Sequence, residues 1–427
     1  MDNKYNILVF PCGSEIGLEI HRSLKFSNHI NLFGGSSVDD HGKFVYENYI
    51  GDIPFFEDPD FLSVIKSVVT KHKIDAIYPA MDSVIARLKF LESEIGCKVI
   101  GSSLETNEVC LSKLATYKIL RDHINVPHIY NSFEEVAEYP VFMKPDTGYG
   151  SRGAKLIKNR EEGIDHLKIF PSSIILDNLP GNEYTIDCFT DKNGVLLFSK
   201  ARVRQRITNG ISVNTIPVNV NQAEFENIAV TINSKIQFSG AWFFQIKKDV
   251  NGKLFLLEVA SRLGGSSSLF RNIGVNFALL TVFTSFGLDV EILINPINIE
   301  LDRALNNIYK LDIEYDYVYI DFDDCLLLGD KINTTLIKFI FQCLNDNKKL
   351  ILITKHIHNI HDTLVKYRLQ NIFDQIIHLE KHQHKFEHIL NKNSIFIDDS
   401  HMERKFIYKQ LNIPVFAPDS VECLLKN

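Results

Sequence analysis

The sequence predicts a multidomain protein that combines the α/β and α+β fold classes. Residues 1–105 alternate short apolar runs with amphipathic segments, as a parallel sheet with covering helices does. Strand patterns separated by glycine-containing turns follow as far as residue 260, and buried-strand patterns that end in polar side chains lie after residue 315. We therefore expect a Rossmann-like domain (1–105), a mainly antiparallel domain (106–300), a linker (301–314) and a second Rossmann-like domain (315–427).

The composition is that of an ordinary globular protein. A chain of 427 residues is too long for one compact core, and its 45% hydrophobic and 23% charged residues are unremarkable values. The net charge of -7 argues against a nucleic-acid or anionic-membrane partner, and no apolar run approaches the ~20 residues of a membrane span. The amino-terminal residues run straight into a strand without a signal-peptide pattern, and the seven cysteines form no Cys-x-x-Cys pair. We expect a cytoplasmic protein with reduced thiols, and a homo-oligomer is compatible with the sequence.

The first domain begins with a βαβ pattern. A strand (5–10), a tight turn and a helix are followed by a second strand at INLFGGSS. The helix FLSVIKSVVTKH, the strand IDAIYPA, the helix VIARLKFLESE and the strand KVIGSS continue the alternation. The turn from Gly13 to Gly17 lacks the full Gly-x-Gly-x-x-Gly fingerprint, so we do not expect a dinucleotide there.

The middle domain carries an ammonium beside a glycine-rich loop. After a helix that holds Lys113, the strand PVFMKP brings Lys144 to its end, and the following loop contains Gly148, Gly150 and Gly153. Glycines let backbone N–H groups approach phosphate oxygens closely, and a neighbouring ammonium adds positive charge. These residues predict a phosphate-binding loop.

A hairpin and an arginine-rich strand complete the middle domain. The hairpin turns at 249–252, and Gln245 and Glu258 face the same way on its two strands in a plausible register. Upstream, Arg202, Arg204 and Arg206 alternate along one strand face. They either present guanidinium groups to an anionic substrate or protect a solvated edge strand by their charge.

The order of these segments over residues 1–300 resembles the ATP-grasp superfamily. The resemblance is strongest to the branch that holds the carbamoyl-phosphate synthetase large subunit and its small carboxylate–amine ligase relatives. It implies that Lys113, Lys144 and the three loop glycines clamp the phosphates of ATP. It also implies a hinge at 176–179 that holds adenine by backbone groups, and it assigns further positions to the nucleotide and its Mg²⁺. These positions are Asp177 and Leu179 in the hinge, Glu183 on the ribose hydroxyls, Gln245 and Glu258 as metal ligands, and Arg262 at the reacting phosphoryl or acyl-phosphate group.

One position departs from the ATP-grasp pattern. The family often has Glu-x-Asn at the second metal position, whereas this chain has Glu258-Val-Ala260. One oxygen ligand is therefore missing. A water or a hydroxyl from Ser261 or Ser266 would fill the coordination sphere, since Mg²⁺ commonly keeps waters; the alternative is weakened catalysis.

In the last domain, functional groups follow three predicted parallel strands. Asp321 and Asp323 follow the first strand, Thr354 ends the second, and Asp398 and Asp399 follow the third. Strand carboxyl ends are where open α/β sheets bind ligands. Phosphate-ester hydrolysis needs these types of group, because one carboxylate attacks phosphorus, a neighbour protonates the leaving oxygen and a cation shields the gathered charge.

This ordered set resembles the haloacid dehalogenase-like phosphatases. The resemblance implies that Asp321 is the nucleophile, that Asp323 is the general acid/base, and that Thr354 is the hydroxyl of the second motif. Lys381 or Lys385, with Lys385 preferred, supplies the lysine of the third motif. It further implies Mg²⁺ bound by Asp321, Asp323, Asp398 and Asp399. Only about 25 residues separate the first two motifs, which leaves room for a helix but not for a cap domain. The histidines at 356–361 and 378–388 lack a His-Glu-x-x-His pattern, and we interpret them as solvated helix faces.

The two resemblances together imply a bifunctional enzyme that uses ATP and Mg²⁺. The first would join a small-molecule carboxylate to an amine through an acyl phosphate, and the second would remove a phosphate monoester from one of these partners. A role in bacterial surface-polysaccharide or sugar modification, with a hexuronic acid or sugar-nucleotide carboxylate and a phosphorylated amino alcohol, is the concrete expectation. The alternative is a nucleotide-binding regulatory protein in which only the phosphatase is active.

Overall fold

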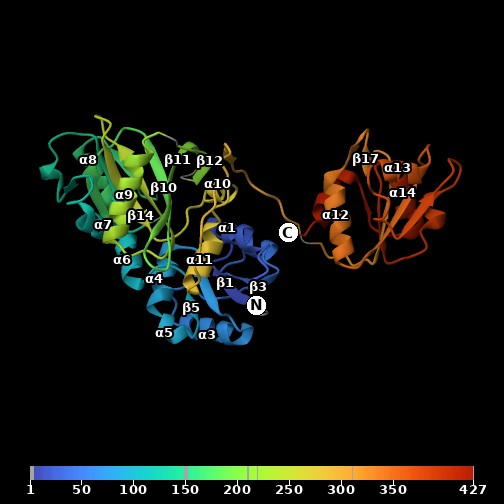
Figure 1. Cartoon of the computed structure of the whole chain (residues 1–427), viewed down its shortest axis with the longest axis horizontal. Helices are drawn as coiled ribbons and strands as arrows, with labels where there is room; N and C mark the ends of the chain where they lie inside the picture. Colours follow the sequence, from blue (N-terminus) through green and yellow to red (C-terminus); the bar gives the residue numbers. More distant parts are fainter. Residues whose placement is uncertain (1–3, 149–151, 209–210, 219, 310, 427) are drawn as a thin grey trace. The chain divides into compact units, whose positions relative to one another are not determined.

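The computed structural model describes residues 4–148, 152–208, 211–218, 220–309 and 311–426, and these form two compact units (Figure 1). The first unit is Met1–Leu305 and the second, called the tail below, is Asn306–Asn427. The division falls inside the predicted linker. The start of that linker belongs to the first unit, because β15 (Leu301–Asp302) pairs with a strand of its large sheet. None of the described helices is long and apolar enough to cross a bilayer.

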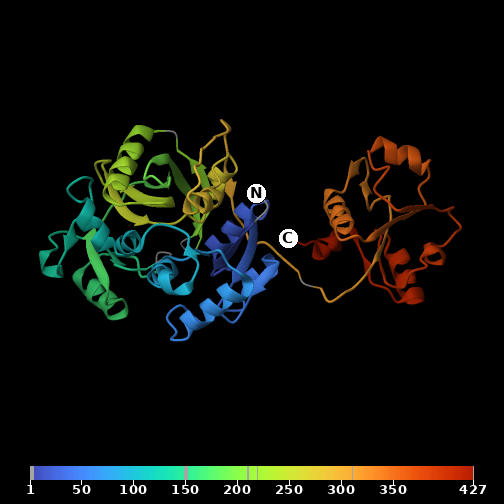
Figure 2. The same cartoon turned by 60° about the horizontal axis from the view of Figure 1, so that its bottom comes forward.

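The first unit opens with a parallel five-stranded sheet of order β3-β2-β1-β4-β5. Its strands are β1 (Tyr5–Phe10), β2 (Ile30–Gly35), β3 (Asn48–Ile50), β4 (Ala76–Pro79) and β5 (Lys98–Val99). Its helices are α1 (Glu15–Leu24), α2 (Gly42–Val45), α3 (Phe61–His72), α4 (Asp82–Phe90) and α5 (Glu92–Ile95), drawn in blue to cyan in Figures 1 and 2. The side chains of β1 alternate between two cores, with Ile7 and Val9 in one and Leu8 and Phe10 in the other. Burial on both faces explains why this strand is a continuous apolar run.

A small antiparallel sheet of order β6-β9-β7-β8 follows. Its strands are β6 (Ile129–Tyr130), β7 (Val141–Pro145), β8 (Lys155–Ile157) and β9 (Ser173–Asp177). The helices α6 (Leu104–Leu111) and α7 (Lys113–Leu120) precede this sheet in the chain. Two more helices connect its strands, η1 (Phe133–Glu135) between β6 and β7 and α8 (Arg160–Ile169) between β8 and β9. The strand β7 carries Lys144.

The large sheet has the order β14-β13-β10-β11-β12-β15, and its strand pairs are antiparallel. It contains β10 (Glu183–Thr190), β11 (Leu196–Thr208), β12 (Ile211–Pro217), β13 (Gly240–Lys248) and β14 (Leu254–Ala260), with the helices α9 (Gln222–Lys235), α10 (Ser268–Arg271) and α11 (Phe277–Ser285). The expected hairpin is present as β13 and β14, and its turn closes with a bond from the Asp249 N–H to Lys253 O. The helix α9, which the sequence pattern did not single out, packs Phe225 into the same core as Trp242 and Phe244.

The tail is a parallel five-stranded sheet of order β20-β19-β16-β21-β22. Its strands are β16 (Tyr317–Ile320), β19 (Lys349–Thr354), β20 (Gln375–His378), β21 (Ser394–Ile397) and β22 (Val415–Phe416). The short pair β17 (Leu327–Leu328) and β18 (Lys331–Ile332) lies before the helix α12 (Thr334–Asn345). The remaining helices are α13 (Ile360–Lys366), η2 (Lys385–His388), α14 (His401–Leu411) and η3 (Pro418–Leu424). As expected from the spacing, the chain between β16 and β19 forms a small hairpin and one helix rather than a cap domain.

We predict that Phe225→Ala lowers the free energy of unfolding of the first unit by about 3–5 kcal/mol, because it leaves a cavity beside the ring of Tyr184 and in the core of Trp242. Trp242 is the chain's single tryptophan, so urea unfolding followed by its fluorescence reports on this unit. Val230→Ala, on the exposed part of the same helix, should change stability by less than about 0.5 kcal/mol. Equal effects of the two substitutions would contradict the packing described.

Candidate functional sites

Lys144 is a buried ammonium at the carboxyl end of β7. Its Nζ donates to Leu257 O at 2.7 Å and to the Tyr117 hydroxyl at 3.1 Å. Burial lowers the pKa of Lys144 to about 8; the charge of Glu258 opposes this shift, and that of Lys113 adds to it. A lysine with this pKa carries its charge at neutral pH but loses it within one or two pH units.

Lys113 and Asp146 fix the beginning of the glycine-rich loop. The Lys113 Nζ donates to Asp146 O at 2.9 Å, while the Asp146 carboxylate accepts from Ser112 Oγ and from Leu114 N, both at 2.8 Å. The carboxylate therefore caps the amino terminus of α7. The two predicted phosphate-binding lysines thus both lie near the beginning of the same loop.

The loop glycines have different outcomes. Gly153 has a φ of +75°, and a Cβ there would lie 2.9 Å from Phe170 Cδ1 and from Pro145 Cγ, so only glycine fits without a shift. At Gly148, an added Cβ would lie 3.8 Å from Pro145 Cβ, which is an ordinary van der Waals distance, so packing does not exclude a side chain there. Gly150 lies outside the described residues, so its assigned contact with phosphate stays a prediction.

Gln245 and Glu258 are direct partners in the β13–β14 ladder, beside a register shift between Gln245 and Ile246. Gln245 is also paired with Thr185 of β10 and donates to its Oγ1 at 3.4 Å. One carboxylate and one amide oxygen on neighbouring strands are hard oxygen ligands of the kind Mg²⁺ takes. The donor set therefore fits a divalent cation, which would be held by these two side chains and waters.

The hydroxyl proposed to replace the missing asparagine ligand is already engaged. Ser261 Oγ donates to Asn107 Oδ1, and Asn107 in turn donates to Ser102 O and Ser103 O. Ser261 is buried within this network. Ala260, which stands where the ATP-grasp pattern often has asparagine, is buried as well. A role for Ser261 as a metal ligand would require its bond to Asn107 to break, which leaves water or Ser266 as the simpler replacement.

Arg262 forms a two-pronged ion pair that the sequence did not reveal. Its Nε lies 2.9 Å from Asp82 Oδ1 and its Nη2 lies 2.8 Å from Asp82 Oδ2, and the guanidinium sits over the ring of Phe243. Asp82 is the first residue of α4, directly beyond β4. Its position as a carboxylate beyond a predicted strand was the available signal, but its partner lies 180 residues away.

The three alternating arginines are paired with carboxylates. Arg202 Nε lies 2.5 Å from Asp187 Oδ2 in a buried pair, and Arg206 Nη2 lies 2.7 Å from Asp302 Oδ2 in an exposed one. The middle residue, Arg204, pairs with Glu183. The interpretation of β11 as an edge strand is wrong, because β10 and β12 flank it. The arginines are also not free guanidinium groups awaiting an anion.

The predicted adenine hinge is bound to its own neighbours. The N–H of Asp177 donates to His128 O at 3.2 Å, and its carboxylate accepts from Tyr130 Oη at 2.9 Å and from His128 N at 3.1 Å. A backbone contact with adenine in this hinge would therefore fall to the residues after Asp177, which include the buried Leu179. Glu183, assigned to the ribose, begins β10 and would have to leave Arg204 or bind while paired with it.

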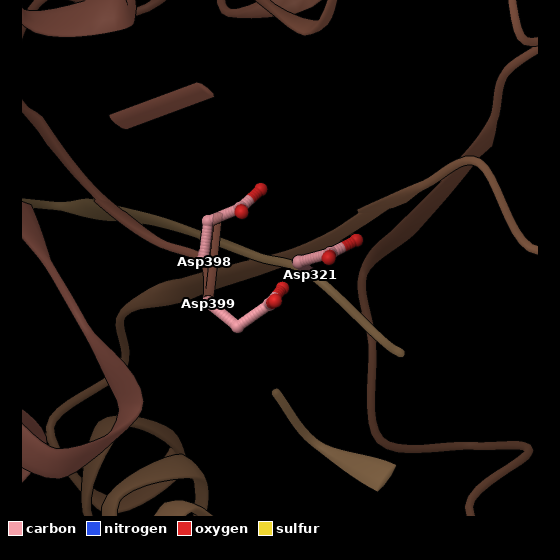
Figure 3. A group of neighbouring side chains, drawn as sticks. All are labelled: Asp321, Asp398 and Asp399. Carbon is pink, nitrogen blue, oxygen red and sulfur yellow. The ribbon is translucent and has the colours of Figure 1, made fainter. Parts of the chain in front are cut away.

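In the tail, carboxylates gather at the ends of the two neighbouring strands β16 and β21. Oxygens of Asp321, Asp398 and Asp399 lie within 4.8 Å of one another, and Figure 3 shows the three side chains grouped at this point. Lys385 Nζ bridges two of them, at 2.8 Å from Asp321 Oδ1 and 2.6 Å from Asp398 Oδ2. Burial raises the pKa of Asp321 against the opposing charge of Lys385, and Asp398 raises it further. A hard divalent cation at this oxygen cluster would offset the remaining negative charge.

The structure distinguishes the two candidate lysines. Lys385 is buried and contacts both strand-end carboxylates, whereas Lys381 is exposed. This geometry favours Lys385 as the lysine of the third motif, an assignment that stays a prediction. Thr354 is fully buried at the end of β19, and its Oγ1 accepts from His356 N at 3.2 Å.

Asp323 has a partner that the sequence did not suggest. His356 Nδ1 lies 2.9 Å and 3.0 Å from its two carboxylate oxygens. The interpretation of His356 as part of a solvated helix face is wrong, because its side chain is only 6% exposed and follows a strand. Asp323 itself is 47% exposed, as a group that meets a substrate should be.

Comparison with known proteins identifies the first unit's fold. Residues 169–299 match the family model described as ATP-grasp in the biosynthetic pathway with Ter operon. The chain is also 28% identical over 183 residues to a D-alanine–D-alanine ligase of Fusobacterium nucleatum subsp. nucleatum, a match that covers 40% of this chain and 62% of that enzyme. A D-alanine–D-alanine ligase of Thermotoga petrophila is 26% identical over 184 residues, with 39% and 61% covered. The chain thus spans about three fifths of the length of the curated relatives it matches.

Solved structures share the architecture. Biotin carboxylase from Campylobacter jejuni, in a β,γ-ATP complex, aligns with a TM-score of 0.58 at 16% identity, covering 68% of this chain and 73% of that one. N5-carboxyaminoimidazole synthetase from Staphylococcus aureus with ADP aligns with a TM-score of 0.57 at 17% identity, covering 69% and 81%. The chain contains the ATP-grasp fold.

ATP-grasp ligases use ATP and Mg²⁺. A third neighbour, the biotin carboxylase domain of Hydrogenobacter thermophilus 2-oxoglutarate carboxylase, was solved with MgADP and aligns with a TM-score of 0.56 at 17% identity, covering 68% of this chain and 71% of that one. The expected ATP-grasp resemblance is therefore confirmed for the first unit, called the ATP-grasp unit below. The resemblance of the tail to haloacid dehalogenase-like phosphatases stays a prediction that its strand order and strand-end groups support.

We predict that Arg202→Ala destabilises the ATP-grasp unit by about 3–5 kcal/mol, because it leaves the Asp187 carboxylate buried without its partner. Arg206→Ala removes the same kind of side chain from the same strand, but its ion pair is more than half exposed and should cost no more than about 1 kcal/mol. Urea unfolding followed by Trp242 fluorescence compares the two. A small loss for Arg202→Ala would show that Asp187 finds water or another partner.

Proposed function

We propose that the chain is a bifunctional enzyme that joins a carboxylate to an amine at the expense of ATP and hydrolyses a phosphate monoester with its tail. One observation carries the ligase half. Two lysines and a paired Gln245 and Glu258 meet where the small and the large antiparallel sheets of the ATP-grasp unit are joined. The relatives named as D-alanine–D-alanine ligases, and a structural neighbour named L-amino acid ligase from Bacillus licheniformis (TM-score 0.52, 17% identity, covering 67% of this chain and 75% of that one), support the same reaction type.

In the ligase reaction, a substrate carboxylate oxygen attacks the γ-phosphorus of ATP, and the bond to the β–γ bridging oxygen breaks to release ADP. The amine nitrogen then attacks the acyl carbon and loses a proton. The bond from the acyl carbon to the phosphate oxygen breaks, and phosphate leaves with that electron pair. Lys144 and Lys113 would bind the phosphate oxygens, and Arg262 would stabilise the charge on the acyl phosphate. Mg²⁺ held by Gln245 and Glu258 would neutralise part of the phosphate charge.

Arg262 is already oriented for this role. Its bidentate contact with Asp82 and its stacking on Phe243 hold the guanidinium in one place. The remaining N–H groups of an arginine still offer donors beyond the two used by Asp82. A preorganised cation stabilises a developing charge without the cost of reorientation during the reaction.

In the phosphatase reaction, a carboxylate oxygen of Asp321 attacks phosphorus, and the bond to the ester oxygen breaks as Asp323 protonates the leaving alcohol. Water then attacks the aspartyl phosphate, gives its proton to Asp323 and releases phosphate. Lys385 contacts the attacking carboxylate of Asp321 through its ammonium and shields its charge. A divalent cation at the three-carboxylate cluster would shield the phosphate oxygens.

The two activities suggest substrates of defined chemistry. We propose a sugar-derived carboxylate, such as a uronic acid, and a phosphorylated amino alcohol as the amine, in bacterial surface-polysaccharide modification. The small hairpin and single helix between β16 and β19 leave the tail without a cap domain, which suits a bulky phosphorylated molecule.

A second candidate function is a nucleotide-binding regulator with an active phosphatase tail. The absence of an asparagine at Ala260, together with the engagement of Ser261 by Asn107, favours it. ADP formation that depends on both an added carboxylate and an added amine distinguishes the ligase from this regulator.

We predict that Lys144→Met abolishes ATP consumption and leaves hydrolysis of a generic phosphate ester intact, while Asp321→Asn has the reverse effect. Methionine keeps the apolar stem of the lysine but removes the ammonium. ADP release, screened against panels of uronic acids, amino acids and amino-alcohol phosphates, measures the first activity. Phosphate release from p-nitrophenyl phosphate measures the second.

Lys158→Ala is the matched control for that experiment, because Lys158 is an exposed lysine after the same glycine-rich segment. It should leave both activities unchanged. Loss of both activities in Lys144→Met, with Trp242 fluorescence unchanged, would contradict two independent sites and point to one composite site.

We predict that affinity for MgATP falls as pH rises from 7 to 9. The pKa of Lys144 is lowered to about 8, so the free protein loses this charge through that range, and phosphate binding then requires a proton to be taken up. Above pH 8 the dissociation constant should rise by up to about tenfold per pH unit. Titration calorimetry at pH 7, 8 and 9 measures this; Lys144→Met should bind weakly at all three, and a flat wild-type profile would remove Lys144 from phosphate binding.

A further inference from the structure

His356 is held at both ends of its imidazole ring. Its Nδ1 faces the carboxylate of Asp323, at 2.9 Å and 3.0 Å, and its Nε2 lies 3.1 Å from Thr363 Oγ1 on α13. The Thr363 hydroxyl donates its hydrogen to Asn359 O at 3.0 Å, so its oxygen is left to accept from the ring. Phe322 packs edge-on against the ring at 5.2 Å between centroids.

The backbone of His356 is fixed as well. Its N–H donates to Thr354 Oγ1 at 3.2 Å, and its carbonyl oxygen lies 2.6 Å from His378 Nε2 at the end of the neighbouring strand β20. The ring therefore projects from the rigid carboxyl end of β19 and has little freedom to turn. Within the described residues of the tail, the His356 ring is thus a fixed neighbour of the half-exposed Asp323 carboxylate.

Asp323 needs such a support. It follows Phe322 in the loop after β16 and precedes Asp324, which has a φ of 53°, so the loop turns sharply at this point. An aspartate that is 47% exposed loses side-chain rotamer freedom only if a partner holds it. The side-chain hydrogen bonds that the described structure gives Asp323 are both to His356.

We propose that His356 is a positioning residue that fixes the Asp323 carboxylate for proton transfer to the leaving group in the tail. This inference rests on the proposed phosphatase function and names a residue that the function did not assign. The imidazole touches neither the three-carboxylate cluster's metal position nor the attacking oxygen of Asp321 in its described contacts. Its effect is therefore exerted through Asp323.

The leaving group provides the test. A positioned general acid contributes about 10²–10⁴-fold when the leaving oxygen must be protonated, and little when the leaving group departs as a stable anion. In the full-length chain with Mg²⁺, His356→Ala should lower kcat/KM for an alkyl phosphate by about 10- to 100-fold, but kcat/KM for p-nitrophenyl phosphate by less than about threefold. This ratio reports formation of the aspartyl phosphate, whereas kcat also depends on its hydrolysis, in which Asp323 acts as a base for both esters.

Two further variants test the geometry. Thr363→Val keeps the shape of the side chain but removes the hydroxyl that holds Nε2, and it should reproduce a smaller loss with the same preference for the alkyl ester. His356→Asn keeps a hydrogen-bonding amide near the position of Nδ1 and should recover part of the alkyl phosphate activity. His361→Ala, at an exposed position of α13, is the matched control and should leave the activity toward both substrates unchanged.

The outcomes separate the two proposals. Equal losses for both esters in His356→Ala and Thr363→Val, with thermal melting unchanged, would overturn the positioning role while leaving the phosphatase in place. If His356→Ala does not fold, Thr363→Val alone decides the question. A wild-type chain that releases no phosphate from either ester, or whose release is unaffected by Asp321→Asn, would overturn the proposed phosphatase and this inference with it.

Discussion

A single backbone carbonyl joins the parts of the ATP-grasp unit. Leu257 O accepts from Lys144 Nζ at 2.7 Å and from Tyr117 Oη at 2.6 Å. Leu257 belongs to the large sheet, Lys144 to the small sheet and Tyr117 to α7. Because these groups are withdrawn from water, losing one partner would leave a polar atom unpaired, which costs more than the bond itself contributes. The ammonium assigned to phosphate is thus also a structural joint, and its position is set before any nucleotide arrives.

The two parallel sheets of the chain use the same arrangement for different chemistry. In each, the first strand of the sheet is central and the chain winds outward to one side before it crosses to the other. Such a crossing leaves a crevice at the carboxyl ends of the central strand and its later neighbour. In the ATP-grasp unit this edge carries Asp82, the partner of Arg262; in the tail it carries Asp321 and Asp398.

Local patterns made much of this predictable from the sequence. The apolar runs placed Asp321, Thr354 and Asp398 at the ends of parallel strands, because a strand that is buried on both faces needs apolar side chains at consecutive positions. The hairpin turn likewise brought Gln245 and Glu258 close together, since a short turn determines register. Their direct pairing also depends on a register shift between Gln245 and Ile246, which the turn alone does not determine.

Contacts between distant segments could not be predicted in this way. Asp82 and Arg262 are 180 residues apart, and Asp323 and His356 are 33 apart, so no spacing in the sequence marks them as partners. The choice between Lys381 and Lys385 also depends on which side chain the irregular chain before β21 buries. The arginines of β11 show the same limit. Their alternation revealed neither their carboxylate partners, nor the register shift between Arg204 and Arg206, nor the interior position of the strand.

The strand β15 has a consequence for any shortened form of the chain. It covers Asn214 and Thr215 of β12, and the adjacent Arg303 bonds Ser212 O and Glu15. A polypeptide that stops at residue 300 would uncover the outer hydrogen-bonding groups of β12, and open sheet borders of this kind recruit strands from other molecules. Self-association of such a truncated chain would then reflect the lost strand rather than a natural oligomer.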